Sequence, residues 1–270
     1  VGRFFVYLFA ILFAFVCLYP FLMVIGGSLM TNSEVVNEGF KVFPKEVTFA
    51  SYKLLLGNGN LILNGYKITL FVTVVGTFCS IIVNGMIGYV LSRKRVAGRK
   101  FMNLYVLLTM LFNGGMVPWY LICTRYLHLK NNIFALILPS VVSAWYIFLI
   151  RNYFSGIPEE IYEAAKIDGC SYYTIFTKII FPLMVPTMIT GCIFSFMWRW
   201  DDFLSALLYI NESAKYPVSL ALKLFCDPGS SSDYGAMFAM ATLSIMPAMI
   251  MFFCLQKYLV EGIASTGIKG

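Results

Sequence analysis

We predict an all-α, polytopic membrane protein with six transmembrane helices, and three observations carry this prediction. Hydrophobic residues make up 60% of the 270-residue chain and charged residues only 12%, with a mean hydropathy of +0.80. A soluble domain carries about 25% charged residues, so this chain has too few polar side chains to cover a surface that faces water. The charges that are present occur in clusters, and the stretches between the clusters are long and apolar.

Each apolar stretch is long enough to cross a bilayer. Six windows contain no Asp, Glu, Lys or Arg: 4–33, 68–92, 101–124, 131–150, 179–198 and 234–256. A hydrocarbon core about 30 Å thick requires roughly 20 helical residues. The windows are apolar all round rather than alternating, which favours helices over barrel strands. Within one transmembrane domain, residues 1–270, we place the spans at about 4–28, 67–91, 101–123, 132–150, 184–207 and 235–257.

The placement of Lys and Arg predicts which connections face the cytoplasm. The short 92–100 connection carries five basic residues, and such loops stay on the cytoplasmic side. With six spans, the cytoplasm then also holds both termini and the 151–183 loop, whereas 30–66, 125–132 and 209–233 lie outside. The net charge of +7 follows from this bias and requires no nucleic-acid partner. The chain begins with Val1 rather than Met, so we expect native residues before it.

Small residues recur at a spacing of four along the second span. The stripe consists of Gly76, Ser80, Asn84 and Gly88. In lipid the hydrophobic effect does not drive helices together, so association depends on small residues that allow close approach. The stripe therefore predicts either an interface with a second subunit or close packing inside this chain.

The connection between the fourth and fifth spans has the pattern of two short helices joined by a sharp turn. Pro158 suits the first helical position, and the two glutamates that follow favour the positive end of the helix dipole. Gly169 is placed to end this helix in a left-handed conformation. Ser171 can cap a second helix that runs toward Pro182. This two-helix loop covers 155–183.

The first of these helices resembles a known element. Its paired alanines give a slim face, which suits either a helix lying on the membrane surface or one entering a groove of another protein. The loop matches the signature loop of permeases from ATP-binding-cassette importers, in which Glu-Ala-Ala precedes Asp-Gly and then a Phe-x-x-Ile-x-Leu-Pro run. The matching residues are Glu163, Ala164, Ala165, Asp168, Gly169, Phe176, Ile179, Pro182 and Pro186. Cys170 and Phe181 replace the alanine and the leucine that are usual in that family.

The resemblance covers nearly the whole chain. Six spans and the C-terminal residues 255–262 and 266–270 are similar to the smaller permease of the maltose-type carbohydrate uptake family, and 112–118 resembles its Gram-positive branch that imports complex oligosaccharides. This implies the type I importer permease fold and a subunit that moves a sugar or oligosaccharide into the cytoplasm of a bacterium. A permease for a non-sugar solute and a secondary transporter are the alternatives. The span centres lack Asp, Glu, Lys and Arg, which disfavours the secondary transporter.

The family also implies partners. Its signature loop forms a coupling helix that docks on a nucleotide-binding subunit, so the resemblance assigns ATPase coupling to Glu163, Ala164, Ala165, Asp168 and Gly169. The implied partners are a second homologous permease, two ATP-binding subunits, the lipid bilayer, and an extracellular sugar-binding protein that meets the 209–233 loop and its flexible 228–232 segment. The sequence contains no Gly-x-x-x-x-Gly-Lys-Ser/Thr element. We therefore expect a non-enzymatic chain without a cofactor or metal, with ATP bound by the partner subunits.

The fifth span predicts a substrate pathway. One helical face carries Thr187, Gly191, Ser195, Trp198 and Asp202, and an aromatic and charged cluster marks the outer end. Charges at membrane depth cost about 2.5–3.5 kcal/mol each, so they pair or face water. Aromatic faces and carboxylates together suit sugars, and the pathway candidates are Ser195, Trp198, Arg199, Trp200, Asp201 and Asp202. The alternative is an interfacial aromatic belt in which Arg199 pairs with Asp202.

Overall fold

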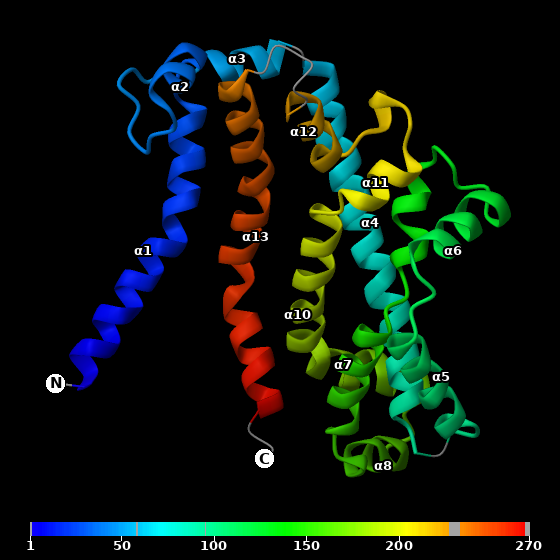
Figure 1. The fold of residues 1–270 in the computed structure, drawn as a ribbon. Helices are drawn as coiled ribbons and strands as arrows, with labels where there is room; N and C mark the ends of the chain where they lie inside the picture. The colour runs from blue at the N-terminus through cyan, green and yellow to red at the C-terminus, as the bar shows by residue number, and fades with distance from the viewer. Residues whose placement is uncertain (1, 58, 95, 227–232, 268–270) are drawn as a thin grey trace. The chain divides into compact units, whose positions relative to one another are not determined.

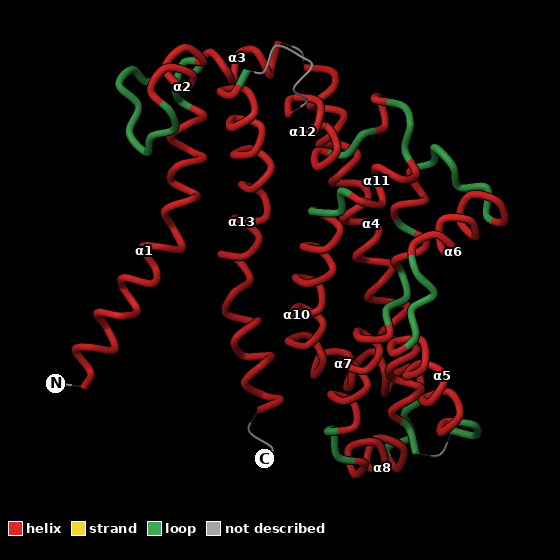
Figure 2. The backbone as a smooth tube through the Cα atoms, viewed as in Figure 1, coloured by secondary structure: helices red, strands yellow, loops and turns green. Residues whose placement is uncertain are grey.

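The computed structural model describes residues 2–57, 59–94, 96–226 and 233–267, which contain helices and connecting loops and no strand (Figures 1 and 2). The all-α prediction is therefore confirmed for this part of the chain. The elements are α1 (Gly2–Ser28), α2 (Asn32–Glu38), α3 (Ala50–Gly57), α4 (Gly59–Ser92), α5 (Arg99–Leu111), α6 (Met116–Leu121), η1 (Ile122–Tyr126), η2 (Ile133–Leu136), η3 (Leu138–Ser140), α7 (Ala144–Ser155), α8 (Glu159–Ile167), α9 (Tyr172–Thr174), η4 (Ile175–Ile180), α10 (Phe181–Trp200), α11 (Leu204–Tyr209), η5 (Ser213–Lys215), α12 (Val218–Cys226) and α13 (Tyr234–Gly267).

Six segments are apolar and long enough to cross a bilayer, but three of them are bent pairs of helices. The continuous segments are Arg3–Ser28, Leu61–Ser92 and Tyr234–Lys257. The bent pairs are Arg99–Leu111 with Met116–Tyr126 at 110°, Ile133–Ser140 with Ala144–Ser155 at 44°, and Ile175–Val185 with Thr187–Trp200 at 66°. When each bent pair is counted as one span, the described residues contain the six spans that the charge-free windows predict.

The bends occur where the sequence interrupts the helical hydrogen-bond ladder. After α5, Gly115 adopts a φ of +86°, a left-handed conformation that glycine tolerates, and its N–H donates to the Asn113 side chain at 2.9 Å. In the fifth span, residue 186 is a proline, which has no N–H to continue the ladder. The third, fourth and fifth windows, each predicted as a single helix, are therefore bent pairs of helices.

The fifth span also ends before its predicted boundary at 207. α10 ends at Trp200, and a Ser205 N–H donates to the Asp202 carboxylate at 3.0 Å as the separate helix α11 begins. An acidic side chain that accepts from a backbone N–H in this way stabilises the start of a helix. The residues between Trp200 and Leu204 thus form a short non-helical connection.

The chain divides into two compact units, each with its own apolar core. One unit comprises Val1–Lys67 and Ser213–Met249, and its core consists of Leu55, Ile62, Val218, Ala221, Ala236, Ala239 and Met240. The other comprises Ile68–Glu212 and Ile250–Gly270, and its core consists of Tyr146, Ile150, Phe154, Ala165, Ile175, Ile180 and Met184. The second core joins α7, α8, η4 and α10, so it positions the loop that resembles a coupling helix.

The glycines of the α4 stripe admit side chains from neighbouring helices of the same chain. A Cβ added to Gly76 would lie 2.4 Å from Nε of Arg199, and one added to Gly88 would lie 2.9 Å from Cγ2 of Ile150. Both distances are shorter than real Cβ contacts, so a side chain at either position would have to displace Arg199 or Ile150. The glycines therefore make intramolecular contacts, which is the second of the two roles that the sequence left open.

The polar residues of the stripe supply hydrogen-bond partners for the backbone at the break in the fourth span. Ser80 Oγ and Asn84 Nδ2 donate to the carbonyl of Val141 at 2.8 and 2.7 Å, and Asn84 Oδ1 accepts the N–H of Ser143 at 2.9 Å. These backbone groups lie between η3 and α7, where no helix supplies partners for them. A backbone group without a partner in lipid costs several kcal/mol. The stripe thus makes the bend between η3 and α7 possible.

Replacing Gly76 with alanine tests this packing. Gly76→Ala should destabilise the protein by about 1–3 kcal/mol because the new methyl group overlaps the buried Arg199 side chain. The matched control is Gly85→Ala in the same helix, where an added Cβ meets nothing within 4 Å. The control should be neutral or stabilising by about 1 kcal/mol, because alanine favours helix more than glycine does. Thermal unfolding in detergent, followed by circular dichroism, measures both, and equal midpoints for the two variants would contradict the packing.

Candidate functional site

The N-terminus of α8 is set by a proline and two glutamates. Pro158 immediately precedes the helix in an extended conformation, with φ of −55° and ψ of 140°, so it occupies the cap and not the first helical position that the sequence predicted. Glu159 and Glu160 form the first turn and are exposed. Their charges lie near the positive end of the helix dipole, which stabilises a short helix of this kind.

The C-terminus of α8 ends as the sequence predicts. Gly169 has a φ of +76°, and its N–H donates to the carbonyl of Lys166 at 3.0 Å, while the Cys170 N–H donates to the carbonyl of Ala165 at 3.0 Å. This pair of bonds is the Schellman motif, which satisfies the last carbonyls of a helix. Ser171 Oγ then accepts the N–H of Thr174 at 3.2 Å and caps the next helix.

That next helix is longer than predicted. Instead of ending near Pro182, it passes from α9 through the π-helix η4 into α10 without interruption. Ile175 and Ile180 of η4 are 1% and 0% exposed and pack in the same core as Ala165. The second helix of the predicted loop is therefore the beginning of the fifth span.

The two alanines of α8 have different surroundings. Ala165 is 4% exposed and packs in the core of its unit, whereas Ala164 is exposed, as are Glu163 and Asp168. The sequence predicted one slim face made of both alanines. The structure instead gives Ala165 the role of an anchor and leaves Ala164, with the neighbouring acidic residues, on the surface that another protein can contact. Figure 1 shows α8 next to the end of α7.

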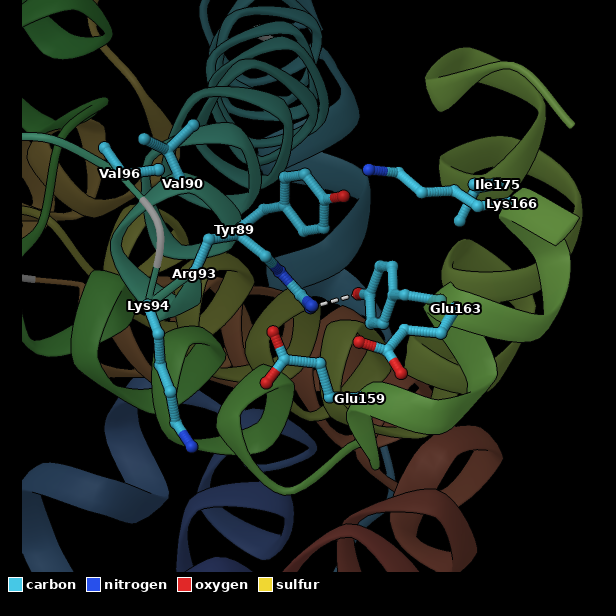
Figure 3. A pocket seen from close by; sticks show the side chains of 10 residues that line it. Tyr89, Val90, Arg93, Lys94, Val96, Glu159, Glu163, Lys166 and Ile175 are labelled. Atoms are coloured by element: carbon cyan, nitrogen blue, oxygen red, sulfur yellow. Dashed lines mark hydrogen bonds between the residues drawn. The ribbon is translucent and has the colours of Figure 1, made fainter.

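A cavity of about 290 Å³ lies between α8 and the C-terminal end of α4 (Figure 3). Its lining residues are Tyr89, Val90, Arg93, Lys94, Val96, Glu159, Tyr162, Glu163, Lys166 and Ile175. Arg93 entered the sequence analysis only as one of five basic charges, and Tyr89 was not singled out. One feature of the sequence could have indicated Arg93: it directly follows the last residue of α4, at the end of the second span.

The pathway candidates of the fifth span do not form one exposed cluster. Trp198 is 57% exposed, Asp201 is exposed, and Asp202 is half-buried. Ser195, Arg199 and Trp200 are buried, with 3%, 9% and 3% of their surface exposed. The structure thus separates three residues that can meet a solute from three that pack inside the chain.

Arg199 holds the bend of the fourth span. It donates hydrogen bonds to Oγ of Ser195 and, at 2.8 Å, to the carbonyl of Ser140, the last residue of η3. Its aliphatic part and Nε lie against Gly76. The buried guanidinium therefore connects α10 to the break between η3 and α7. Ser80 and Asn84 of α4 hydrogen-bond to the backbone of the same break.

The exposed end of α10 carries aromatic rings. The ring of Trp145 contacts those of Trp198 and Phe194, at centroid distances of 5.8 and 5.4 Å, while Trp200 stacks on Phe196 at 5.4 Å with an interplanar angle of 7°. The exposed ring of Trp198 suits both the face of a sugar ring and a membrane–water interface, whereas the ring of Trp200 is buried. The geometry therefore fits either role that the sequence left open for this cluster.

Comparison with known proteins identifies the family. Residues 1–265 match the family described as the binding-protein-dependent transport system inner membrane component. The polygalacturonan/rhamnogalacturonan transport system permease protein YtcP of Bacillus subtilis is 32% identical over 279 residues, covering 98% of this chain and 97% of that protein. Protein LplC of Bacillus subtilis is 33% identical over 268 residues, covering 94% and 90%.

A solved structure agrees with these relatives. A chain of a bacterial ABC transporter involved in the import of the acidic polysaccharide alginate has a TM-score of 0.86 and 29% sequence identity, covering 95% of this chain and 96% of that one. The family match and the structural match each extend over nearly the whole chain. This multi-pass membrane protein belongs to the family of inner membrane components of binding-protein-dependent transport systems, the permeases of ABC importers.

Proposed function

We propose that this chain is the permease subunit of an ATP-driven importer that conducts a sugar or oligosaccharide into the cytoplasm. The observation that carries the proposal is α8, a capped helix with an exposed acidic surface at the connection between the fourth and fifth spans. The names of the relatives support the substrate class, because pectic polymers and alginate are both carbohydrates.

The proposal includes an orientation and a set of partners. The basic 92–100 connection favours a cytoplasmic position for α8 and both termini, in the cytoplasmic membrane of a bacterium. Two separate ATP-binding subunits bind and hydrolyse ATP, so this chain is not an enzyme and holds no cofactor. A second homologous permease completes the pathway. An extracellular sugar-binding protein meets the 209–233 loop, of which residues 227–232 lie outside the described part of the chain.

The core around α8 supplies a mechanical route from the ATPase to the pathway. Glu163, Ala164 and Asp168 contact the ATP-binding subunit, and Gly169 fixes the end of the helix. Ala165 packs with Ile175 and other residues of η4, which continues into α10. Closure of the ATP-binding subunits would therefore displace α8 and α10 together, as a rigid-body movement that tilts the spans without any chemistry on this chain.

The outer end of α10 is the proposed contact with the solute. Trp198 offers an exposed aromatic face, and Asp201 and Asp202 offer carboxylates that accept hydrogen bonds from sugar hydroxyl groups. Ser195, Arg199 and Trp200 support this surface from inside the chain.

The alanine pair of α8 should respond unequally to arginine. Ala164→Arg leaves the chain stable, because the side chain is exposed, but it blocks the ATPase contact and lowers substrate-stimulated ATP hydrolysis by about tenfold, the effect of about 1.4 kcal/mol. Ala165→Arg places a charge in the core and destabilises the chain itself by roughly 3–5 kcal/mol. Thermal unfolding of the chain and ATPase assays on the reconstituted complex measure these effects. Ala164→Ser is the small-residue control, and equal destabilisation by both arginines would be evidence against the assignment.

The solute surface is tested by Trp198→Ala and Asp202→Asn. Asparagine retains a side-chain acceptor for the Ser205 N–H, so Asp202→Asn removes the charge and keeps the start of α11. Each variant should lower uptake of tritiated digalacturonate into proteoliposomes by about tenfold, equivalent to about 1.4 kcal/mol. Co-purification with the partner subunits should be unchanged. Normal uptake by both variants would remove this cluster from the pathway and favour the aromatic belt.

A further inference from the structure

Arg93 joins two elements that are distant in the sequence. Its guanidinium carbon lies 4.8 Å from the ring centroid of Tyr89 in α4 and 3.7 Å from that of Tyr162 in α8. The same guanidinium donates a hydrogen bond to the Tyr162 hydroxyl, drawn as a dashed line in Figure 3. One side chain at the end of the second span thus holds a tyrosine of its own helix and a tyrosine of α8.

The chemistry of the three groups favours this arrangement. A guanidinium is planar and always charged, so it stacks on aromatic faces and keeps its donors for a hydrogen bond. The Tyr162 hydroxyl is neutral at neutral pH and can accept this bond, and burial raises its pKa further. The cation also lies at the negative end of the α4 dipole. The stack is therefore compatible with its surroundings in both charge and geometry.

The end of α4 from which Arg93 projects is held in place. Arg99 Nε donates to the carbonyl of Leu91 at 2.8 Å, and the Arg93 N–H donates to the carbonyl of Val90 at 3.2 Å. These bonds satisfy carbonyls that the end of a helix leaves without partners. A side chain projecting from such a fixed end can hold a second helix at a constant distance.

Tyr89 also connects the stack to the core of the unit. Its ring lies 5.0 Å from that of Phe154 in α7 and 5.1 Å from that of Phe176 in η4, both in edge contacts. In α8, Ala165 is buried in the same core, against which Tyr89 and Tyr162 also pack. The Arg93 stack therefore gives α8 an attachment to α4 in addition to its attachment to η4 and α10.

We propose that Arg93 is a positioning residue that clamps the coupling helix to the second span, so that movement of α8 displaces α4 as well as α10. The proposal rests on the proposed function, because it assigns a role within the same coupling step. Loss of the clamp leaves the ATPase contact of α8 intact and removes one of the two routes by which α8 moves the pathway. ATP hydrolysis should then continue with less transport.

The test compares Arg93→Gln with Lys94→Gln. Lys94 is the exposed neighbour on the same cavity wall, and its side chain extends away from the guanidinium of Arg93 (Figure 3). In proteoliposomes holding the complete complex, Arg93→Gln should raise the ATP hydrolysed per tritiated digalacturonate imported by about fivefold or more, whereas Lys94→Gln should leave this ratio unchanged. Arg93→Lys and Tyr162→Phe, which each keep part of the stack, should give intermediate ratios.

A second measurement on the same complexes does not depend on the sugar. Hydrogen–deuterium exchange of the α8 amides should be about tenfold faster in Arg93→Gln than in Lys94→Gln, because the helix has lost one attachment. An unchanged ATP-to-sugar ratio, or a proportionate loss of hydrolysis and transport, would overturn the clamp, as would equal exchange in the two variants. If Arg93→Gln does not fold, the two conservative variants decide. A wild-type complex that imports no sugar contradicts the proposed function, whereas the exchange result still decides the contact.

Discussion

The structure depends on one constraint: backbone N–H and C=O groups at membrane depth must find partners inside the protein. Three of the six spans are broken, and each break releases such groups. At the break between η3 and α7, Asn84 of α4 accepts the N–H of Ser143 and donates to the carbonyl of Val141. From the opposite helix, Arg199 donates to the carbonyl of Ser140. A bend that would be prohibitive in lipid is thereby satisfied by side chains of α4 and α10.

This requirement also explains the glycines of α4. A side chain at position 76 would occupy the space of the Arg199 guanidinium, and one at position 88 would overlap Ile150. Close approach of the helices is thus a condition for the hydrogen bonds at the break, because short polar side chains reach only neighbouring backbones. The glycines of the stripe allow the neighbouring helices to approach closely. Its polar residues then supply the hydrogen-bond donors and acceptors that the backbone at the break requires.

The sequence predicted the features that depend on neighbouring residues, such as the apolar spans and the end of α8. The six charge-free windows located the spans, and Gly169 ends α8 with the left-handed conformation expected from its position. The bends were not read from the windows, because averaged hydropathy does not register the turn at Asn113 and Gly115. Ala164 and Ala165 are adjacent in sequence, and only the packing of η4 against α8 buries one and exposes the other. Arg199 was placed in the pathway for its charge, whereas Gly76 and Ser140, distant in sequence, hold it inside.

The two attachments of α8 differ in what they can transmit. Ala165 packs against η4, which leads into a span bent by 66°, whereas Tyr162 is held through Arg93 to α4, whose Leu61–Ser92 segment is one continuous helix. An uninterrupted helix can pass a displacement along its length, whereas a span with a break can absorb part of that displacement as a change of angle at the break. Under the proposed function, a single displacement of α8 would therefore shift α4 and turn α10. Arg199 of α10 lies in contact with Gly76 of α4. The different movements of these two helices would therefore act at the break between η3 and α7, where Arg199 donates its hydrogen bond.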